Sequence, residues 1–217
     1  MDFDAARFNM VEQQIRPWDV LDPLVLDVFS TLQRELFVPD EYQRLAFSDT
    51  AIDIGHGQST LPPKLEARLA QALDIESTDR ILEIGTGRGF LTAVLATLGA
   101  HVTSIEMFEP LATAAKENLG RAGITNATLH VGDGIDGWTT AAPYDVIVLG
   151  GSLASRRASI EQQLSRNGRM FVVLGEPPVM EAVIIRRIDD NTWVQESLFE
   201  TEVPPLIGGE AKQSFEF

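Results

Sequence analysis

The sequence contains no cysteine and has few basic side chains for its length. Among 217 residues, 17 are Lys or Arg and 32 are Asp or Glu, which gives a formal net charge of −15. The absence of cysteine excludes disulfides, thiolate nucleophiles and cysteine-rich metal sites. Nucleic acids and anionic membranes normally require a basic surface, so the charge argues against both as partners.

Long apolar runs are also absent. No stretch approaches the roughly 18 apolar residues that span a bilayer. Residues 1–10 are acidic and do not have the basic-then-apolar order of a signal peptide. We therefore expect a soluble, cytoplasmic protein. Only three histidines are present, without paired spacing, so no metal site is predicted.

From residue 80 onward, short apolar runs alternate with segments of helical periodicity. The predicted strands are 80–85, 101–106, 127–132, 144–150 and 168–175, and the predicted helices are 90–99, 110–123 and 156–168. This alternation is typical of an α/β protein with a Rossmann-like, doubly wound, mostly parallel sheet covered on both faces. The runs 182–188 and 192–203 are joined by three residues only, too few for a crossover helix, so they predict a terminal antiparallel hairpin.

The N-terminal third has helical spacing instead, at 2–15, 20–32 and 63–73. We expect it to form a cap on the sheet and not an independent domain. The sequence thus predicts a single domain over 1–217, with a helical cap and active-site loop over 1–75 and a cofactor-binding core over 76–217.

Glycines and acids follow the first three predicted strands of the core. Gly85, Gly87 and Gly89 have the spacing G-x-G-x-G, which differs from the dinucleotide fingerprint G-x-G-x-x-G. Glu83 would repel a pyrophosphate but attract a sulfonium and an α-amino group, which favours S-adenosylmethionine over NAD. Glu106 ends the second strand, where it can accept hydrogen bonds from ribose hydroxyls, and Asp133 follows the third, where it can take the adenine amino group. The complete set of predicted cofactor-binding residues is Gln58, Ser59, Glu83, Gly85, Thr86, Gly87, Gly89, Glu106, Met107, Asp133 and Gly134.

Three segments together resemble the protein-L-isoaspartate O-methyltransferase family. They are ELFVPDEYQRLAFSDTAIDIGHGQ (35–58), LEIGTGRGFLTAVLA (82–96) and EVPPLIGGE (202–210), within a likeness that runs from about residue 10 to 210. The resemblance implies methylation of the isoaspartyl carboxylate in damaged proteins or peptides, with S-adenosylmethionine as the cofactor. A carboxylate is already ionised at pH 7, so the enzyme needs alignment and exclusion of water more than a general base.

The chain departs from the family pattern in the loop that carries the family's catalytic serine. Where the family reads G-Q-T-I-S-Q-P, residues 57–63 place Leu61 at the serine and Pro62 at the following glutamine. Ser59 keeps a hydroxyl at the family's threonine. A shift of one residue would let Thr60 replace the serine; without it, leucine cannot hydrogen-bond a carboxylate and isoaspartyl activity would be lost. Ser59 and Thr60 are the candidate catalytic residues, with Asp49, which matches an aspartate of the family block.

Three other functions remain open at this stage. The acceptor could be a different carboxylate or hydroxyl, such as that of a small molecule, since Leu61 and Pro62 make the pocket more apolar. The protein could bind S-adenosylmethionine without turnover. A nicotinamide-dependent dehydrogenase is the fourth possibility, against which Glu83 and the glycine spacing count. The oligomeric state is not predicted.

Overall fold

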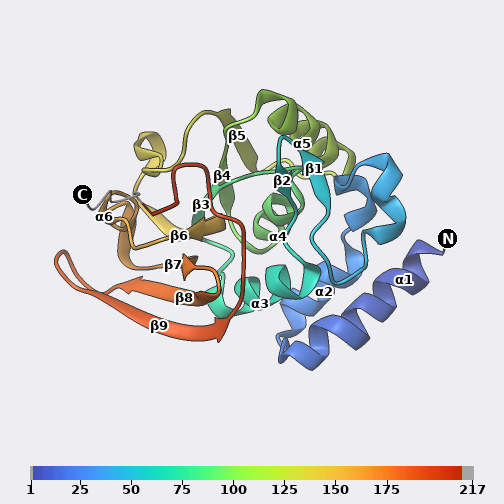
Figure 1. Ribbon diagram of the computed structural model, residues 1–217, viewed down its shortest axis with the longest axis horizontal. Coiled ribbons are helices and arrows are strands. Elements are labelled where there is room, and N and C mark those ends of the chain that lie inside the picture. Colours follow the sequence, from blue (N-terminus) through green and yellow to red (C-terminus); the bar gives the residue numbers. More distant parts are fainter. Residues whose placement is uncertain (1, 212–217) are drawn as a thin grey trace, which may run out of the picture.

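The computed structural model describes residues 2–211 and is built around a seven-stranded sheet (Figure 1). In spatial order the strands are β5 (Ala127–Val131), β4 (His101–Glu106), β3 (Arg80–Ile84), β6 (Tyr144–Leu153), β7 (Leu164–Glu176), β8 (Val179–Arg187) and β9 (Trp193–Glu200). The strands from β5 to β7 are parallel to their neighbours, whereas β8 and β9 are antiparallel. This confirms the predicted Rossmann-like sheet that ends in an antiparallel hairpin.

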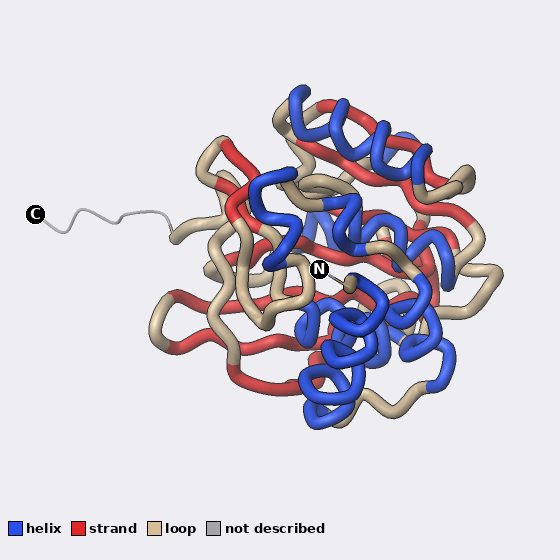
Figure 2. Tube along the Cα trace, turned by 90° about the vertical axis from the view of Figure 1, so that its right-hand side faces the viewer, coloured by secondary structure: helices blue, strands red, loops and turns tan. Residues whose placement is uncertain are grey.

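Helices make up most of the chain before β3. They are α1 (Phe3–Met10), a π-helical turn (Val11–Ile15), α2 (Pro23–Thr31), α3 (Pro63–Leu73) and the 3₁₀ segments Arg16–Trp18, Arg34–Phe37 and Asp40–Leu45. Helix α2 begins where the side chain of Asp22 accepts hydrogen bonds from the first free N–H groups, with proline at the first helical position. Helices α1 and α2 lie toward the right-hand end of Figure 1, which faces the viewer in Figure 2, and α3 lies nearer the middle.

The N-terminal helices share one apolar core with the sheet's own helices. Phe29 of α2 and Phe37 of the following 3₁₀ segment both make edge-on contacts with Phe90, the first residue of α4 (Phe90–Leu98). Buried residues on either side of residue 75 belong to the same cluster. The cap is therefore held against the sheet by hydrophobic burial.

The two faces of the sheet are covered unequally. Helices α3 and α4 bury Leu69 and Leu95 against one face, and α5 (Glu109–Arg121) lies beside them. The opposite face is covered by Ile160 of the short helix α6 (Ala158–Glu161) and by loop side chains such as Trp138. The expected cover of helices on both faces is thus largely missing from the second face.

The predicted helix over 156–168 is wrong beyond its first turn. Only α6 is helical, and the chain enters β7 at Leu164. Asn167 adopts a left-handed conformation with φ 65°, and a Cβ on Gly168 would lie 2.9 Å from the carbonyl oxygen of Ser165. The side chain of Gln163 receives a hydrogen bond from the Trp138 N–H and donates to the Asp136 carbonyl. These contacts hold the segment in a tight turn, which overrides its helical periodicity.

Candidate active site

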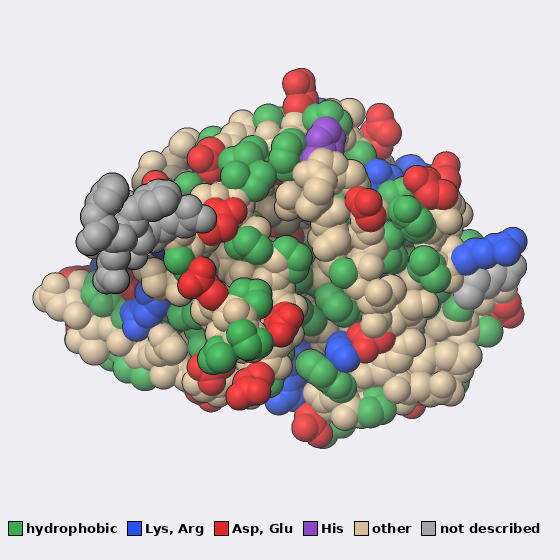
Figure 3. All heavy atoms as spheres, viewed as in Figure 1, with side chains coloured by type: hydrophobic (Ala, Val, Ile, Leu, Met, Phe, Trp, Pro, Cys, Tyr) green, Lys and Arg blue, Asp and Glu red, His purple; other side chains and the backbone are tan. Residues whose placement is uncertain are grey.

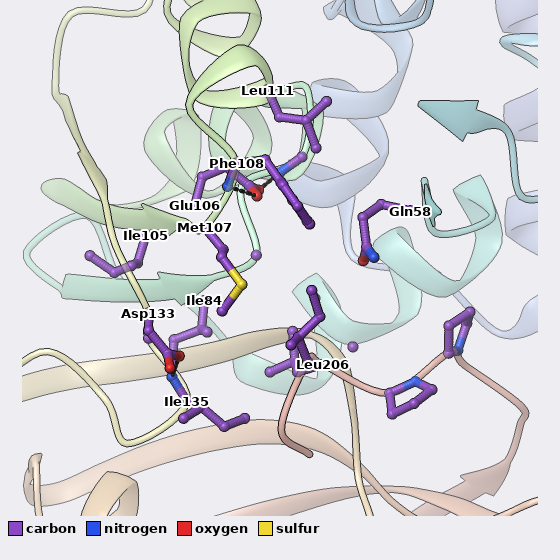
Figure 4. A pocket seen from close by; sticks show the side chains of 18 of the residues that line it. Gln58, Ile84, Ile105, Glu106, Met107, Phe108, Leu111, Asp133, Ile135 and Leu206 are labelled. Carbon is purple, nitrogen blue, oxygen red and sulfur yellow. Dashed lines mark hydrogen bonds between the residues drawn. The ribbon is translucent and has the colours of Figure 1, made fainter. Parts of the chain in front are cut away.

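A crevice opens at the carboxyl ends of β3, β4 and β6, on the face seen in Figure 3, where acidic side chains are scattered among apolar ones. Its lining includes these residues, shown in part in Figure 4: Gln58 and Ser59; Gly85 and Gly87; Glu106, Met107 and Phe108; Asp133 and Gly134; Gly150 and Gly151. The segment from Val203 to Ile207 closes the remaining side. The crevice therefore lies where parallel α/β sheets bind ligands.

The glycine loop after β3 needs glycine for its shape. Gly85, Gly87 and Gly89 have φ of 94°, 56° and 93°, in the region that other residues rarely adopt. A Cβ on Gly87 would lie 3.2 Å from the side chain of Ile54. Gly85 and Gly87 therefore expose bare backbone to the crevice, so a ligand can approach it closely. Gly89, also predicted to bind the cofactor, does not line the crevice and instead lies against Ala115 of α5. Thr86, in contrast, is buried and its hydroxyl lies 2.5 Å from that of Ser104.

Glu106 connects the glycine loop to the end of β4. Its side chain is only 5% exposed, and its carboxylate accepts hydrogen bonds from the N–H groups of Gly87 (2.8 Å) and Phe108 (3.0 Å) (Figure 4). Asp133 is exposed, and one of its oxygens accepts the Ile135 N–H at 2.9 Å. Both acids line the crevice, as predicted from their positions after neighbouring strands.

Glu83 lies outside the crevice, contrary to its predicted contact with the cofactor. Its side chain is fully buried, and one carboxyl oxygen accepts hydrogen bonds from the hydroxyls of Thr92 (2.5 Å) and Ser104 (2.6 Å). Burial raises the pKa of Glu83 to about 8 despite these two hydrogen bonds, so the group is largely neutral at pH 7. Its carboxyl group faces hydroxyls of α4 and β4 and does not line the crevice, so the structure gives no support for a direct contact with the cofactor.

A small hairpin forms the wall beside the glycine loop. Its strands are β1 (Asp53–Gly55) and β2 (Gln58–Ser59), and the turn places His56 at φ 57°. The His56 ring stacks on Phe108 at a centroid distance of 4.7 Å, which connects the hairpin tip to the far wall. Both strand residues of β2 line the crevice, consistent with their predicted place beside the cofactor.

Thr60 is held beside the crevice by two hydrogen bonds with Ile52. Its N–H donates to the Ile52 carbonyl (2.9 Å), and its hydroxyl accepts the Ile52 N–H (3.1 Å), so both ends of the residue are fixed to the preceding strand. Leu61 lines the crevice itself and is only 9% exposed. Thr60 lines a smaller cavity beside the crevice and not the crevice itself, so its replacement of the serine stays one of two predicted alternatives. The crevice wall carries a leucine side chain at this position.

Comparisons with known proteins agree with this geometry. The model of the family "Protein-L-isoaspartate(D-aspartate) O-methyltransferase (PCMT)" matches residues 6–211. The chain is 36% identical over 210 residues to protein-L-isoaspartate O-methyltransferase 2 of Marinobacter nauticus, covering 96% of both chains. It is 37% identical over 211 residues to the enzyme of the same name from Roseiflexus castenholzii, covering 97% of this chain and 96% of the relative. The chain belongs to this family.

Solved structures of the same family share the fold. One protein-L-isoaspartate O-methyltransferase has a TM-score of 0.79 and 25% identity; the match covers 92% of this chain but 65% of that one. A Plasmodium falciparum protein assigned to the family, in complex with S-adenosyl-L-homocysteine, has a TM-score of 0.77 and 18% identity. That match covers 95% of this chain and 98% of the other. The second of these supports the fold alone.

In this member of the protein-L-isoaspartate O-methyltransferase family, a buried arginine supports the loop before α3. Arg34 is 1% exposed, ion-paired with Glu66, and donates to the carbonyls of Ala46 (2.8 Å) and Leu61 (2.9 Å). Its guanidinium lies over the Phe90 ring at 4.4 Å. Sequence reasoning missed this pair. The available signal was Glu66, a charged residue on the buried stripe of α3 that also contains Leu69 and Leu73.

Asp49, predicted as catalytic from the family block, is not brought to the crevice. Its carboxylate is ion-paired with Lys64 at 2.6 Å, and the Lys64 ammonium also lies 4.3 Å from the Trp18 ring centroid. Asp49 does not line the crevice or the smaller cavity beside it. The pair instead tethers the exposed loop to the start of α3. Within residues 2–211, no cluster of acids and histidines could hold a metal ion, and no helix has the length and apolarity to cross a membrane.

Proposed function

We propose that this protein is an S-adenosylmethionine-dependent methyltransferase that esterifies the carboxylate of L-isoaspartyl residues in proteins or peptides. The family match over residues 6–211 carries this proposal. The crevice supports it, because a bare glycine loop and two acids on neighbouring strands converge on one edge of the sheet. A cytoplasmic location remains a prediction from the sequence.

The crevice residues fit S-adenosylmethionine. The backbone of Gly85 and Gly87 has no Cβ to keep a ligand away, and Glu106 offers a buried carboxylate suited to the ribose hydroxyls. Asp133, exposed at the edge of the crevice, suits the adenine amino group. When bound, the cofactor supplies an activated methyl group, which leaves its sulfur for an acceptor oxygen.

The chain's own contribution is orientation and exclusion of water. An acceptor carboxylate with a pKa near 4 is ionised at pH 7, so no side chain has to remove a proton. Ser59 is the hydroxyl that lines the crevice at its acceptor end, and its position suits a hydrogen bond to that carboxylate. Leu61, Val203 and Leu206 make the adjoining walls apolar, which keeps water away from the reacting oxygen.

Leu61 favours a second candidate, an acceptor other than isoaspartate. A leucine wall loses the hydrogen bond that a serine would give to a carboxylate, and this cost is large in a desolvated pocket. An acceptor with an apolar group beside its carboxylate or hydroxyl would fit the same wall better. This candidate keeps the cofactor and the reaction type and changes only the acceptor.

Transfer of a labelled methyl group from S-adenosylmethionine to an isoaspartyl peptide tests the proposal. The matched background is Gly85→Arg, because a side chain at this φ of 94° would meet Leu206 and Gly150 and fill the crevice. We expect base-labile methyl ester well above that background, and none with the aspartyl form of the peptide. Cofactor binding without any ester would instead favour the second candidate, and absence of cofactor binding would refute both.

A further inference from the structure

Arg88, in the glycine loop, is a charged residue beside the crevice that the proposed reaction does not use. It lies between Gly87 and Gly89, two residues before the start of α4, and is partly buried. Its carbonyl accepts a hydrogen bond from the side chain of Asn118 at 3.0 Å, which fixes this part of the loop against α5. The position of the residue is therefore well defined by its backbone.

A second cavity, of about 50 Å³, lies beside the crevice and is lined by Arg88 together with Ser59, Thr60 and Leu61. The two hollows share six lining residues: Ile54, Ser59, Leu61, Gly85, Gly87 and Gly150. The smaller cavity is therefore a continuation of the crevice at its acceptor end. It exceeds the space of a single water molecule, so it can take a small polar group such as a carboxylate.

The guanidinium of Arg88 has no protein partner among residues 2–211. Its Nε is buried without a hydrogen bond, and none of the ion pairs in the described chain includes it. The other buried arginines differ: Arg7, Arg34 and Arg169 each pair with a buried carboxylate. A partly buried charge without a partner is costly, and acids outnumber bases in this chain by 32 to 17. The buried Nε donor is therefore available to an anionic ligand.

One acid also lines this cavity, but it does not neutralise Arg88. The carboxyl group of Glu66 is held by Arg34, and burial raises its pKa to about 7 against the effect of that arginine. Its repulsion of a bound anion is consequently reduced. The planar fork of an arginine matches the two oxygens of a carboxylate better than any other side chain does.

The reacting carboxylate is a poor ligand for such an arginine. It loses its charge as the ester forms, so a strong ion pair would stabilise the ground state more than the transition state and slow the reaction. A carboxylate that keeps its charge has no such penalty. Two are available in the proposed reaction: the amino-acid carboxylate of the cofactor, and an acidic side chain next to the isoaspartyl residue of the acceptor.

We propose that Arg88 binds a non-reacting carboxylate at the acceptor end of the crevice, supplied by the cofactor's amino-acid group or by an acidic neighbour of the acceptor residue. The inference rests on the proposed function, since both carboxylates belong to that reaction. It assigns Arg88 a role in binding and not in the chemical step.

The test compares Arg88→Gln and Arg88→Lys with wild type and with Arg121→Gln, an exposed arginine in the last turn of α5 that carries the same charge change. Calorimetry gives the Kd of S-adenosylhomocysteine and of 5′-methylthioadenosine, which has the same nucleoside and thioether but no amino-acid carboxylate. Initial rates give KM for isoaspartyl peptides with and without a neighbouring aspartate.

A charge-assisted hydrogen-bonded pair corresponds to a change of roughly 10–100-fold. If the cofactor supplies the carboxylate, Arg88→Gln raises the Kd of S-adenosylhomocysteine by this factor and leaves the Kd of methylthioadenosine unchanged. Arg88→Lys gives an intermediate Kd for S-adenosylhomocysteine. If the acceptor supplies it, only the KM of the acidic peptide rises. Equal weakening of both nucleosides, or behaviour identical to Arg121→Gln, would overturn the inference. Failure of wild type to bind S-adenosylhomocysteine would instead refute the proposed function.

Discussion

Leu61 gives the crevice a hydrocarbon wall at the position where the family resemblance places a serine. Its side chain belongs to the buried cluster that includes Leu65 and Leu91, so the residue stabilises the fold as well as shaping the acceptor pocket. Its carbonyl, which accepts a hydrogen bond from Arg34, does not depend on the side chain. A substitution at this residue therefore changes packing and pocket chemistry together, while the backbone anchor remains.

We predict that Leu61→Ser raises kcat on an isoaspartyl peptide and lowers the free energy of unfolding by about 2–5 kcal/mol. The gain follows from a hydroxyl that can bind the acceptor carboxylate, and the loss from a smaller side chain in the core. Peptide methylation rates and urea unfolding measure the two effects. Leu61→Ala is the matched control, with a similar loss of stability and no gain in rate. Equal rates for the two variants would contradict the prediction.

At the scale of elements, Arg34 joins three parts of the chain that are separate in sequence. It binds Glu66 of α3, the carbonyl of Ala46 after the last 3₁₀ turn, and that of Leu61 before α3. The loop that carries the crevice wall is thus attached to the core through one buried guanidinium. Removing Arg34 leaves the buried Glu66 carboxyl group without its partner, whereas removing Glu66 leaves Arg34 with two carbonyl acceptors but no counter-ion.

Arg34→Met should lower the free energy of unfolding by about 3–5 kcal/mol, since it leaves Glu66 unpaired in the core. The double variant with Glu66→Leu should lose less than the sum of the two single variants, because no charge remains buried. Chemical denaturation of wild type, the two single variants and the double variant measures the coupling free energy between the two residues. Arg16→Met is the control: Arg16 and Glu12 are about 40% exposed, and such pairs contribute under about 1 kcal/mol. Additive losses would argue against the buried pair.

The sequence correctly predicted those elements whose local residue pattern agrees with their packing in the fold. The strands of the core and the final hairpin follow directly from apolar runs and a three-residue connection. The helix predicted over 156–168 was wrong because the contacts of Gln163 with residues 136 and 138, which no local pattern reveals, outweigh the helical periodicity of the segment. The predicted contact of Glu83 with the cofactor has a related weakness, because a sequence gives the position of an acid in a strand but not the direction of its side chain.

At the scale of the whole molecule, two buried acids make stability depend on pH. Burial raises the pKa of Glu83 to about 8 and that of Glu66 to about 7, from an ordinary value of 4.5. At a pH between 4.5 and the raised pKa, each of these carboxyl groups holds a proton in the folded protein and releases it in the unfolded chain. The stabilisation is therefore complete below about pH 4.5 and declines as the pH rises toward 8.

We predict that the free energy of unfolding falls between pH 5 and 8 with a slope of up to about 1.4 kcal/mol per pH unit for each such group. Glu83→Gln, which resembles the protonated acid, should reduce this slope without abolishing it, because Glu66 still titrates. Urea unfolding at several pH values measures it. Glu109→Gln, an exposed acid in the first turn of α5, is the control and should leave the slope unchanged. An identical slope in Glu83→Gln and wild type would refute the assignment.

The last wall of the crevice, Val203 to Ile207, bears on the order of folding events. Leu206 lies against Gly85, about 120 residues earlier in the chain, and Ser152 bonds the same segment through its N–H and its hydroxyl. Closing so long a loop is entropically unfavourable and depends on the sheet being paired first. Ligand affinity should accordingly be the last native property to return on refolding, after the helical and strand signals have recovered.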